Sequence, residues 1–238
     1  MESTDMNIRF PESPFLLRCA ESGRMGGTVE YDGGRIVDGG FIYLLGRPDI
    51  AEFAAREDAY RCRMMICMNE EWRSALLNRY PQMVRTVRRQ MKAPDVLRVG
   101  GVPKLPDGFR LRMFGSDEFE LHPFGHGAKY ADYSDFLING SGAVVYHDGD
   151  IVASCSTFIS MDGEVEADIS TKREYRRMGL AANCAAAMLR DCTFRGFRIH
   201  WDAQNEASTR LAERFGFTVE YAYEAFSFVE PETLDTNL

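Results

Sequence analysis

The sequence lacks several patterns that would assign it quickly to a class of protein. No apolar run approaches the roughly 20 residues needed to cross a bilayer, and the opening MESTDMNIRFPESP has no basic or apolar signal-peptide region. The six cysteines show no C-x-x-C spacing and the four histidines are scattered, so no metal site is expected. These absences predict a cytoplasmic protein with reduced thiols and no membrane partner.

Basic residues are also too few for a nucleic-acid-binding surface. The chain carries 28 Lys and Arg against 36 Asp and Glu, a net charge of −8. Residues 1–106 account for +2 of this and residues 107–238 for −10. Because nucleic-acid binding requires a basic face, no such partner is expected. An acidic half suits a cationic partner such as a small amine, and an acidic surface that only maintains solubility explains the charge equally well.

The 238 residues are enough for one large domain or two small ones, and composition favours two. Residues 93–108, APDVLRVGGVPKLPDG, contain three prolines and three glycines, which are typical of a junction. We therefore predict an N-terminal α/β lobe over 1–106 and a second domain over 107–238. In the lobe we expect a small sheet in TVEYDGGRIVDGGFIYLLG, a helix in RPDIAEFAARE, a buried strand in YRCRMMICM, a helix capped by Asn69, and a second helix over PQMVRTVRRQMK beginning at Pro81.

The second domain has the pattern of a mixed α/β fold. FRLRMF, GAVVYHDGDIVASCSTFIS, EVEADIST and FRIHWDA read as strands, and SDEFELH, YADYSDFLING, the Ala-rich run after residue 179 and NEASTRLAERFG read as helices. FTVEYAY and AFSFV read as closing strands. The predicted order is β-α-α-β-β-β-α-β-α-β, and Cys184 and Cys192 are expected in the core of the Ala-rich helix.

The helix start in EYRRMGLAANCAAAML is electrostatically unusual. Arg176 and Arg177 lie at the positive end of the helix dipole, where cations are unfavourable. A bound phosphate removes this conflict, because the unpaired N–H groups of residues 177 to 181 and both guanidinium groups then face an anion. Gly179 has no Cβ and would let such a ligand approach the backbone. An exposed basic turn that binds nothing is the alternative.

A second motif follows. In WDAQNEASTRLAERFGF, Asn205 is placed to cap a helix that ends before Gly216-Phe217. Together with Arg176-x-x-Gly179-x-Ala181 and the strand order, this resembles the GNAT superfamily of acyl-CoA-dependent N-acetyltransferases over residues 107 to 230. The run from EVEADIST to ERFGF, with NEEWRSALLNRYPQMVRTVRRQM in the first half, is similar to the branch that contains the zwittermicin A resistance acetyltransferase.

The resemblance implies a GNAT core, acetyl-CoA as co-substrate, no metal, and transfer of an acetyl group to a small primary amine in a ternary complex. It implies that the acetyl group lies where two strands, EVEADIST and FRIHWDA, splay apart, and that a backbone N–H stabilises the oxyanion. Because residues 107–230 already contain every strand that such a core requires, we predict that the lobe over 1–106 shapes the amine site. We expect a monomer or homodimer. The implied cofactor-binding residues are Ile169, Ser170, Thr171, Arg176, Arg177, Met178, Gly179, Leu180, Ala181, Asn205 and Ser208.

The catalytic base is expected on EVEADIST, where period-2 alternation places Glu164, Glu166 and Asp168 on one face. Glu166 is the first candidate for deprotonating the amine, directly or through water, and Glu164 the second. An exposed acidic face without catalytic function is the alternative. The family often has a Tyr acid at the position of Ala212, so Tyr223, Ser208 or water would have to protonate the thiolate here.

Two neighbouring residues and two other functions complete the expectations. Trp201 is expected in the core more than at the amine site, and His200 is expected to be structural. A protein or peptide amine is an alternative substrate. A regulatory module that binds acyl-CoA without turnover is the alternative of a different class, because the usual acid is absent at Ala212.

Overall fold

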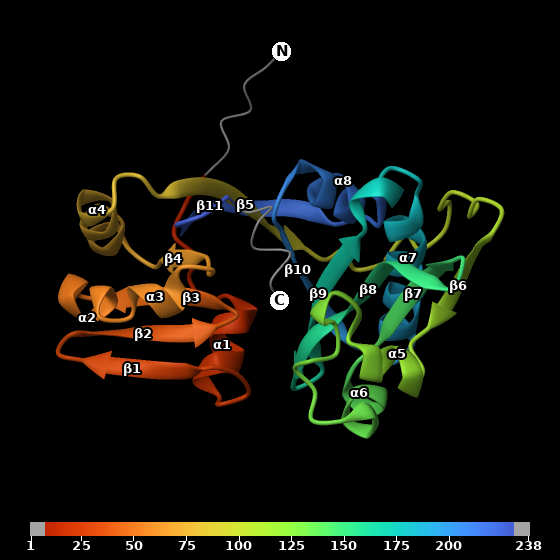
Figure 1. Ribbon diagram of the computed structural model, residues 1–238, viewed down its shortest axis with the longest axis horizontal. Helices are drawn as coiled ribbons and strands as arrows, with labels where there is room; N and C mark the ends of the chain where they lie inside the picture. The colour runs from red at the N-terminus through yellow and green to blue at the C-terminus, as the bar shows by residue number, and fades with distance from the viewer. Residues whose placement is uncertain (1–7, 231–238) are drawn as a thin grey trace, which may run out of the picture. The chain divides into compact units, whose positions relative to one another are not determined.

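The computed structural model describes residues 8–230 (Figure 1). The chain forms two compact units: the first runs to Gln90 and resumes at Val219, and the second spans Met91–Thr218. This division differs from the predicted boundary after residue 106. The apolar side chains of Leu97, Val99 and Val102 pack against the core of the second unit, which places the proline- and glycine-containing segment in that unit.

The first unit contains a mixed sheet with the strand order β1-β2-β3-β4-β11-β5. The predicted small sheet is confirmed, because β1 and β2 pair antiparallel, as do β2 and β3. β3 and β4 pair in parallel, with two short helices, α2 and α3, between them in the chain. The strands are β1 (Gly27–Tyr31), β2 (Gly34–Gly39), β3 (Phe41–Gly46), β4 (Met65–Cys67), β5 (Val84–Lys92) and β11 (Thr218–Ser227), and the helices are α1 (Phe15–Glu21), α2 (Ile50–Ala54), α3 (Glu57–Tyr60) and α4 (Glu70–Arg79).

A side-chain cap marks the start of α4. The Asn69 side chain accepts a hydrogen bond of 2.8 Å from the backbone N–H of Trp72, so the predicted cap of α4 is confirmed. Trp72 is fully buried and packs in one apolar cluster with Phe53 and Leu76. Helix α1 was not predicted, because seven residues after Pro14 are too short to show a helical repeat.

The predicted second helix over PQMVRTVRRQMK is wrong, because most of this segment is strand β5. Helix α4 ends at Arg79, and Pro81 lies in the turn that follows it. Proline ends a preceding helix as readily as it begins a new one, so its position was ambiguous. The β-branched residues Val84, Thr86 and Val87 then favour a strand.

The second unit contains a mixed sheet with the order β10-β9-β8-β7-β6. β9 and β10 are parallel, and the other neighbouring pairs are antiparallel. The order of helices and strands is the predicted one, except that the two closing strands form the single strand β11. The elements of this unit are β6 (Phe109–Met113), α5 (Ser116–Leu121), α6 (Tyr133–Asn139), β7 (Gly142–His147), β8 (Asp150–Met161), β9 (Glu164–Thr171), α7 (Leu180–Phe194), β10 (Arg198–Ala203) and α8 (Glu206–Arg214).

Helices cover both faces of this sheet (Figure 1). Alternation along β7 shows the division: Ala143 and Val145 belong to the apolar cluster that contains α7, whereas Val144 packs with Phe119 of α5 and Phe136 of α6. Val165 of β9 faces α7 in the same way. The predicted mixed α/β class is therefore confirmed, and α5 and α6 lie on the sheet face opposite α7.

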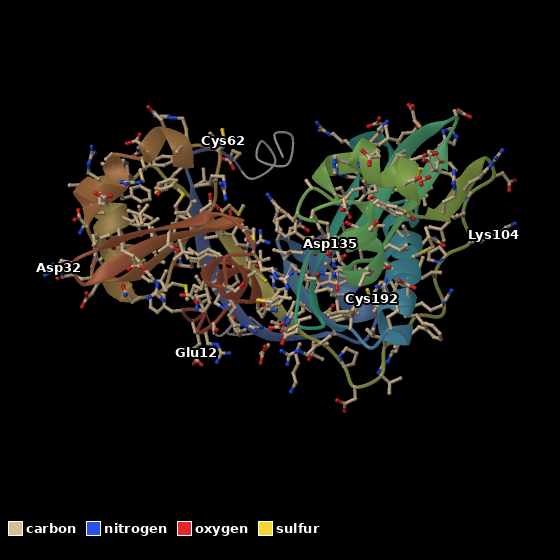
Figure 2. All side chains as sticks on the ribbon, turned by 90° about the horizontal axis from the view of Figure 1, so that it is seen from below. Glu12, Asp32, Cys62, Lys104, Asp135 and Cys192 are labelled. Atoms are coloured by element: carbon tan, nitrogen blue, oxygen red, sulfur yellow. The ribbon has the colours of Figure 1, made fainter. Side chains whose placement is uncertain are left out.

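The cysteines form no disulfide among the residues that the structure describes. Cys184 and Cys192 lie in α7 and are fully buried in the core, as predicted, whereas Cys62 is exposed in the first unit (Figure 2). Within residues 8–230, no helix combines the length and apolar character that membrane crossing requires. The same residues contain no group of three or more His, Cys, Asp or Glu side chains arranged to hold a metal ion.

Candidate functional site

The N-terminus of α7 presents backbone donors. Gly179 is its N-cap residue, with φ of 79° in the left-handed region that favours glycine. The Asn183 N–H donates to the Gly179 carbonyl over 3.2 Å, so the N–H groups of residues 180–182 precede the first helical bond. Leu180 buries its side chain in the core, with 1% exposed, and Ala181 is half-buried. Only backbone atoms of Leu180 can therefore contact a ligand at this helix end.

Two arginines flank these donors. Arg176 and Arg177 are exposed, and neither forms an ion pair within the described part of the chain. The Arg176 Nε–H donates to the carbonyl oxygen of Thr171 over 3.3 Å, which links the turn to the end of β9. Arg177 has φ of 65°, a left-handed conformation that is uncommon for a residue with a Cβ. Met178, the next residue, is 38% exposed. The predicted phosphate-binding turn thus carries two positive charges without carboxylate partners.

The structure gives Gly179 a second reason to be glycine. A Cβ at this position would lie 3.1 Å from Cβ and Cγ of Pro103, closer than an ordinary van der Waals contact. The Asn183 side chain holds the same segment, because its Nδ2–H donates to the Pro103 carbonyl over 2.9 Å and to the Gly179 carbonyl over 3.0 Å. The space beside Gly179 is therefore filled by the chain itself.

β9 and β10 part after a short paired stretch. They pair only from Arg198↔Glu164 to His200↔Glu166, although β9 continues to Thr171 and β10 to Ala203. The N–H of Asp202 donates to a carboxylate oxygen of Glu166 over 3.1 Å instead of to the backbone of β9. Beyond Glu166, β9 remains paired with β8 on its other side. The opening between two adjacent parallel strands is the geometry that the family resemblance implied.

The predicted acidic face of β9 exists, and its first two carboxylates are engaged. Val165, Ala167 and Ile169 pack on the α7 side, so Glu164 and Glu166 lie on the opposite face. Glu164 forms an ion pair with Arg198, and its Oε2 lies 2.6 Å from the His200 Nε2. The hydrogen bond that Arg198 itself donates to Glu164 raises the pKa of Arg198.

Glu166 is the last paired residue of β9, and its side chain is buried, with 6% of the residue exposed. Its carboxylate accepts the Asp202 N–H at the point where the strands separate. Glu164 and Glu166, the two predicted candidates for the base, thus both lie within the paired stretch.

Asp168 lies beyond the last pair and contacts a histidine that the sequence did not single out. His126, in the loop between α5 and α6, is 1% exposed, and its Nε2 lies 3.2 Å from Asp168 Oδ2. Its Nδ1 lies 2.7 Å from the hydroxyl of the buried Ser154 on β8. The His126 Nε2 makes no hydrogen bond of good geometry to a described residue, so its relation to Asp168 is one of proximity. The Asp168 side chain is 41% exposed, so its carboxylate lies beside a buried imidazole and still reaches solvent.

The start of α8 is built as predicted. The Asn205 side chain accepts a 3.0 Å hydrogen bond from the Ser208 N–H, which confirms the N-cap. The Ser208 hydroxyl accepts a 3.1 Å bond from the indole N–H of Trp201, whose ring is 2% exposed and packs between Phe215 and Phe217. Trp201 is therefore a core residue. Ala212, at the position of the family's Tyr, is fully buried.

The predicted cofactor-binding residues fall into two groups. Ile169, Ser170 and Thr171 form the end of β9, and the Arg176 bond to Thr171 joins them to the basic turn. The buried hydroxyl of Thr171 has no hydrogen-bond partner among the described residues. Exposed arginines, free helix N–H groups and an unsatisfied hydroxyl fit a ligand that combines phosphates with polar amides. Asn205 and Ser208 form the second group, at the start of α8, where they cap that helix.

A cavity of about 300 Å³ in the first unit is unrelated to these features. Its charged lining residues satisfy one another, because Glu224 accepts a 2.7 Å bond from Arg73 and also pairs with Arg85. The side chain of Glu224 is 8% exposed. We assign no chemistry to this cavity.

Comparisons with known proteins agree with this geometry. A family model described as GNAT acetyltransferase matches residues 13–226. A Bacillus subtilis protein named as an uncharacterised N-acetyltransferase is 31% identical over 120 residues, which cover 48% of this chain and 46% of that protein. The match therefore spans about half the length of that relative.

Solved structures show the same fold. A GCN5-related N-acetyltransferase-like protein from Streptococcus suis has a TM-score of 0.80 at 24% identity, covering 90% of this chain and 92% of that one. A GCN5-related N-acetyltransferase from Kribbella flavida has a TM-score of 0.56 at 18% identity, covering 92% and 98%. The family model covers most of the sequence, and the splayed strands and basic helix start agree with it: the chain belongs to the GNAT acetyltransferase family.

Proposed function

We propose that this protein is an acetyl-CoA-dependent N-acetyltransferase that acts on the primary amine of a small molecule. The observation that carries the proposal is the opening between β9 and β10, which lies next to a helix start bearing two exposed arginines that form no ion pair with any residue the structure describes. Family membership supports acyl transfer, and acetyl-CoA as the donor is inferred from the family. The acceptor class, a cytoplasmic location, the relation to the zwittermicin A resistance branch and a role in antibiotic resistance are parts of this proposal.

Acetyl-CoA would supply a thioester whose acyl carbon is open to attack by an amine. On our assignment, Arg176 and Arg177 with the first N–H groups of α7 bind its phosphates. The edge of β9 at residues 169–171 offers backbone groups to its amides, and Asn205 contributes from α8. Holding both reactants in one opening supplies much of the expected rate enhancement.

The amine must lose a proton before it attacks, since an alkyl ammonium with a pKa near 10 is almost fully protonated at pH 7. We retain Glu166 as the first candidate for the base, acting through water, because it lies at the vertex of the opening. Glu164 is the second candidate, although Arg198 and His200 already pair with it. With a buried Ala212, the thiolate would be protonated by water or leave unprotonated.

Glu166 also has a structural role, and two substitutions separate this role from catalysis. Glu166→Gln keeps an oxygen that accepts the Asp202 N–H but removes the basicity, so kcat should fall by about 10²- to 10⁴-fold with normal stability. Glu166→Ala removes both and should in addition destabilise the fold by about 1–3 kcal/mol, because the Asp202 N–H loses its partner. Unchanged turnover in Glu166→Gln would move the base to Glu164 or to bulk water.

Two other functions remain as alternatives. A peptide or protein amine would use the same chemistry in a more open groove. A regulatory module would bind acyl-CoA without consuming it, and the missing Tyr at Ala212 is the feature that favours it. Measuring thiol release from acetyl-CoA with a mixed panel of small amines and lysine peptides distinguishes all three, because a regulatory module releases no thiol.

The phosphate assignment is tested by calorimetry with CoA. Gly179 is a poor site for the test, because any side chain there also meets Pro103. Ala181→Asp is better: a carboxylate in the first turn favours the helix dipole but repels a phosphate. We expect unchanged thermal stability with CoA affinity lowered at least 10-fold, and a similar loss in Arg176→Ala. Full CoA affinity in both variants would refute the assignment.

The first lobe completes the proposal. We propose that the N-terminal lobe, predicted over 1–106 and ending at Gln90 in the structure, influences which amine is accepted, because the strand opening and the basic helix start both lie in the second unit, Met91–Thr218. Exchange of this lobe with that of a relative should change acceptor preference and leave the KM for acetyl-CoA unaltered. Unchanged acceptor preference in the exchanged protein would contradict this role.

A further inference from the structure

We propose that Asp168 binds the ammonium group of the acceptor and that His126 is its positioning residue. This inference rests on the proposed function and names a specificity-determining residue for it. It starts from the positions of the three carboxylates on the acidic face of β9, which differ in their distance from the strand opening and in what surrounds them.

Position along β9 separates the three groups. Glu164 and Glu166 lie where β9 and β10 are still paired, whereas Asp168 follows the last pair. On the other side, Asp168 is opposite Ser156 of β8, so the strand itself stays fixed in the sheet. Asp168 is therefore the carboxylate of this face that lies beside the opening.

Exposure points the same way. Glu166 is 6% exposed and accepts the Asp202 N–H, and the Glu164 carboxylate lies against Arg198 and His200. The Asp168 side chain, at 41% exposed, is accessible to a ligand. An ammonium entering the opening would therefore meet the Asp168 carboxylate before it met either glutamate.

Two buried side chains lie behind Asp168, and on our proposal the nearer one, His126, orients its carboxylate for binding an ammonium. His126 is 1% exposed and Ser154 is fully buried, so neither side chain can be reached from solvent. The imidazole lies between them, 3.2 Å from Asp168 Oδ2 and 2.7 Å from Ser154 Oγ. A hydroxyl can donate or accept, so Ser154 bonds His126 in its neutral or its charged form. Buried side chains that orient a carboxylate before the ligand arrives reduce the entropy lost on binding.

The chemistry fits a primary amine. A carboxylate is an acceptor-only group, and an alkyl ammonium is a compact cation with three donors. Charge-assisted bonds between them are stronger than neutral hydrogen bonds, and a carboxylate fixed beforehand gains most from them. The acceptor would therefore be a cation held at Asp168, with Glu166 at the vertex serving the proton transfer.

The test measures thiol release by the full chain with acetyl-CoA and a panel of spermidine, an aminoglycoside, cadaverine and a lysine peptide. For any amine that is turned over, Asp168→Asn should raise its KM by about 10- to 100-fold and leave the KM for acetyl-CoA unchanged. Asp162→Asn is the matched control. It makes the same change in the exposed β8–β9 turn, at a left-handed position that Asn tolerates, and should change neither value.

The positioning role of His126 is tested by the effect of His126 variants on the KM for the amine that Asp168 binds. His126→Gln retains an N–H donor and should raise the amine KM less than His126→Leu, with normal CoA affinity by calorimetry in both. Ser154→Ala provides an independent variant if His126→Leu does not fold. Turnover with an unchanged amine KM in Asp168→Asn would overturn this inference and leave the proposed function standing. Absence of turnover with every amine, while CoA still binds, would overturn the proposed function and this assignment with it.

Discussion

The contact between Gly179 and Pro103 leads to a prediction that needs no ligand. Gly179→Ala introduces two costs that the structure separates. A Cβ in the left-handed conformation costs about 1–2 kcal/mol. The same Cβ would lie 3.1 Å from two carbons of the Pro103 ring, and overpacking of this kind typically costs about 1–3 kcal/mol more. We therefore expect Gly179→Ala to destabilise the protein by about 2–5 kcal/mol, which lowers Tm by roughly 4–20 °C in a domain of this size.

The chain contains a matched control at the other end of the same helix. Gly196 follows α7 with φ of 75°, close to the 79° of Gly179, but a Cβ added to Gly196 would meet nothing within 4 Å. Gly196→Ala should therefore cost only the conformational strain of about 1–2 kcal/mol. The difference between the two variants isolates the Pro103 contact.

Chemical denaturation without ligand measures both variants, and Pro103→Gly completes a double-mutant cycle. In the Pro103→Gly background, Gly179→Ala should lower the free energy of unfolding by little more than Gly196→Ala does, because the ring carbons are gone. If Gly179→Ala and Gly196→Ala are equally destabilising in the natural background, Pro103 does not pack against this turn and the reasoning fails.

Three further predictions concern residues around the site and the core. Asn183→Ala should cost about 1–3 kcal/mol in unfolding experiments, because it removes both bonds to the carbonyls of Pro103 and Gly179; an unaltered stability would show that neither bond matters. Asn205→Ala should lower the free energy of unfolding by about 1 kcal/mol because the N-cap of α8 is lost, whereas Asn205→Asp keeps the cap and the stability. A KM for acetyl-CoA that rises in both variants would indicate that Asn205 also contacts the ligand. A thiol reagent at pH 8 should label Cys62 alone in the native protein and all six cysteines after unfolding. Burial raises the pKa of Cys184 and Cys192 to about 12, so their reactive thiolate fraction at pH 8 is only about 10⁻⁴; rapid native labelling of more than one thiol would contradict the buried core.

Features determined by a few neighbouring residues were predictable. Asn69 and Asn205 cap their helices through bonds to an N–H three residues ahead, and the sequence shows the cap and the helix together. The alternation in EVEAD placed Glu164 and Glu166 on one face of β9 for the same reason.

Features that depend on distant segments were not predictable. Asn183 and Pro103 are 80 residues apart, and His126 and Ser154 are 28 apart. No periodicity in either segment indicates these partners, because the contact arises only when a loop folds over a sheet. The histidine beside Asp168 was missed for this reason. β5 was misassigned because Pro81 is compatible with the first turn of a helix as well as with the turn after α4 that the structure shows.

The strand opening and the acidic face share a physical origin. Two parallel strands that remained paired would use the Asp202 N–H in their own ladder, but here the Glu166 carboxylate accepts it. A side chain on the acidic face thus substitutes for a backbone carbonyl at the residue where pairing ends. The same alternation that buries Val165 against α7 places Asp168 on the opposite face of β9, where the His126 Nε2 lies 3.2 Å from its Oδ2. The acidic face and the carboxylate that accepts the Asp202 N–H therefore come from one alternating segment, EVEAD, and the loop from α5 to α6 places a buried imidazole beside it.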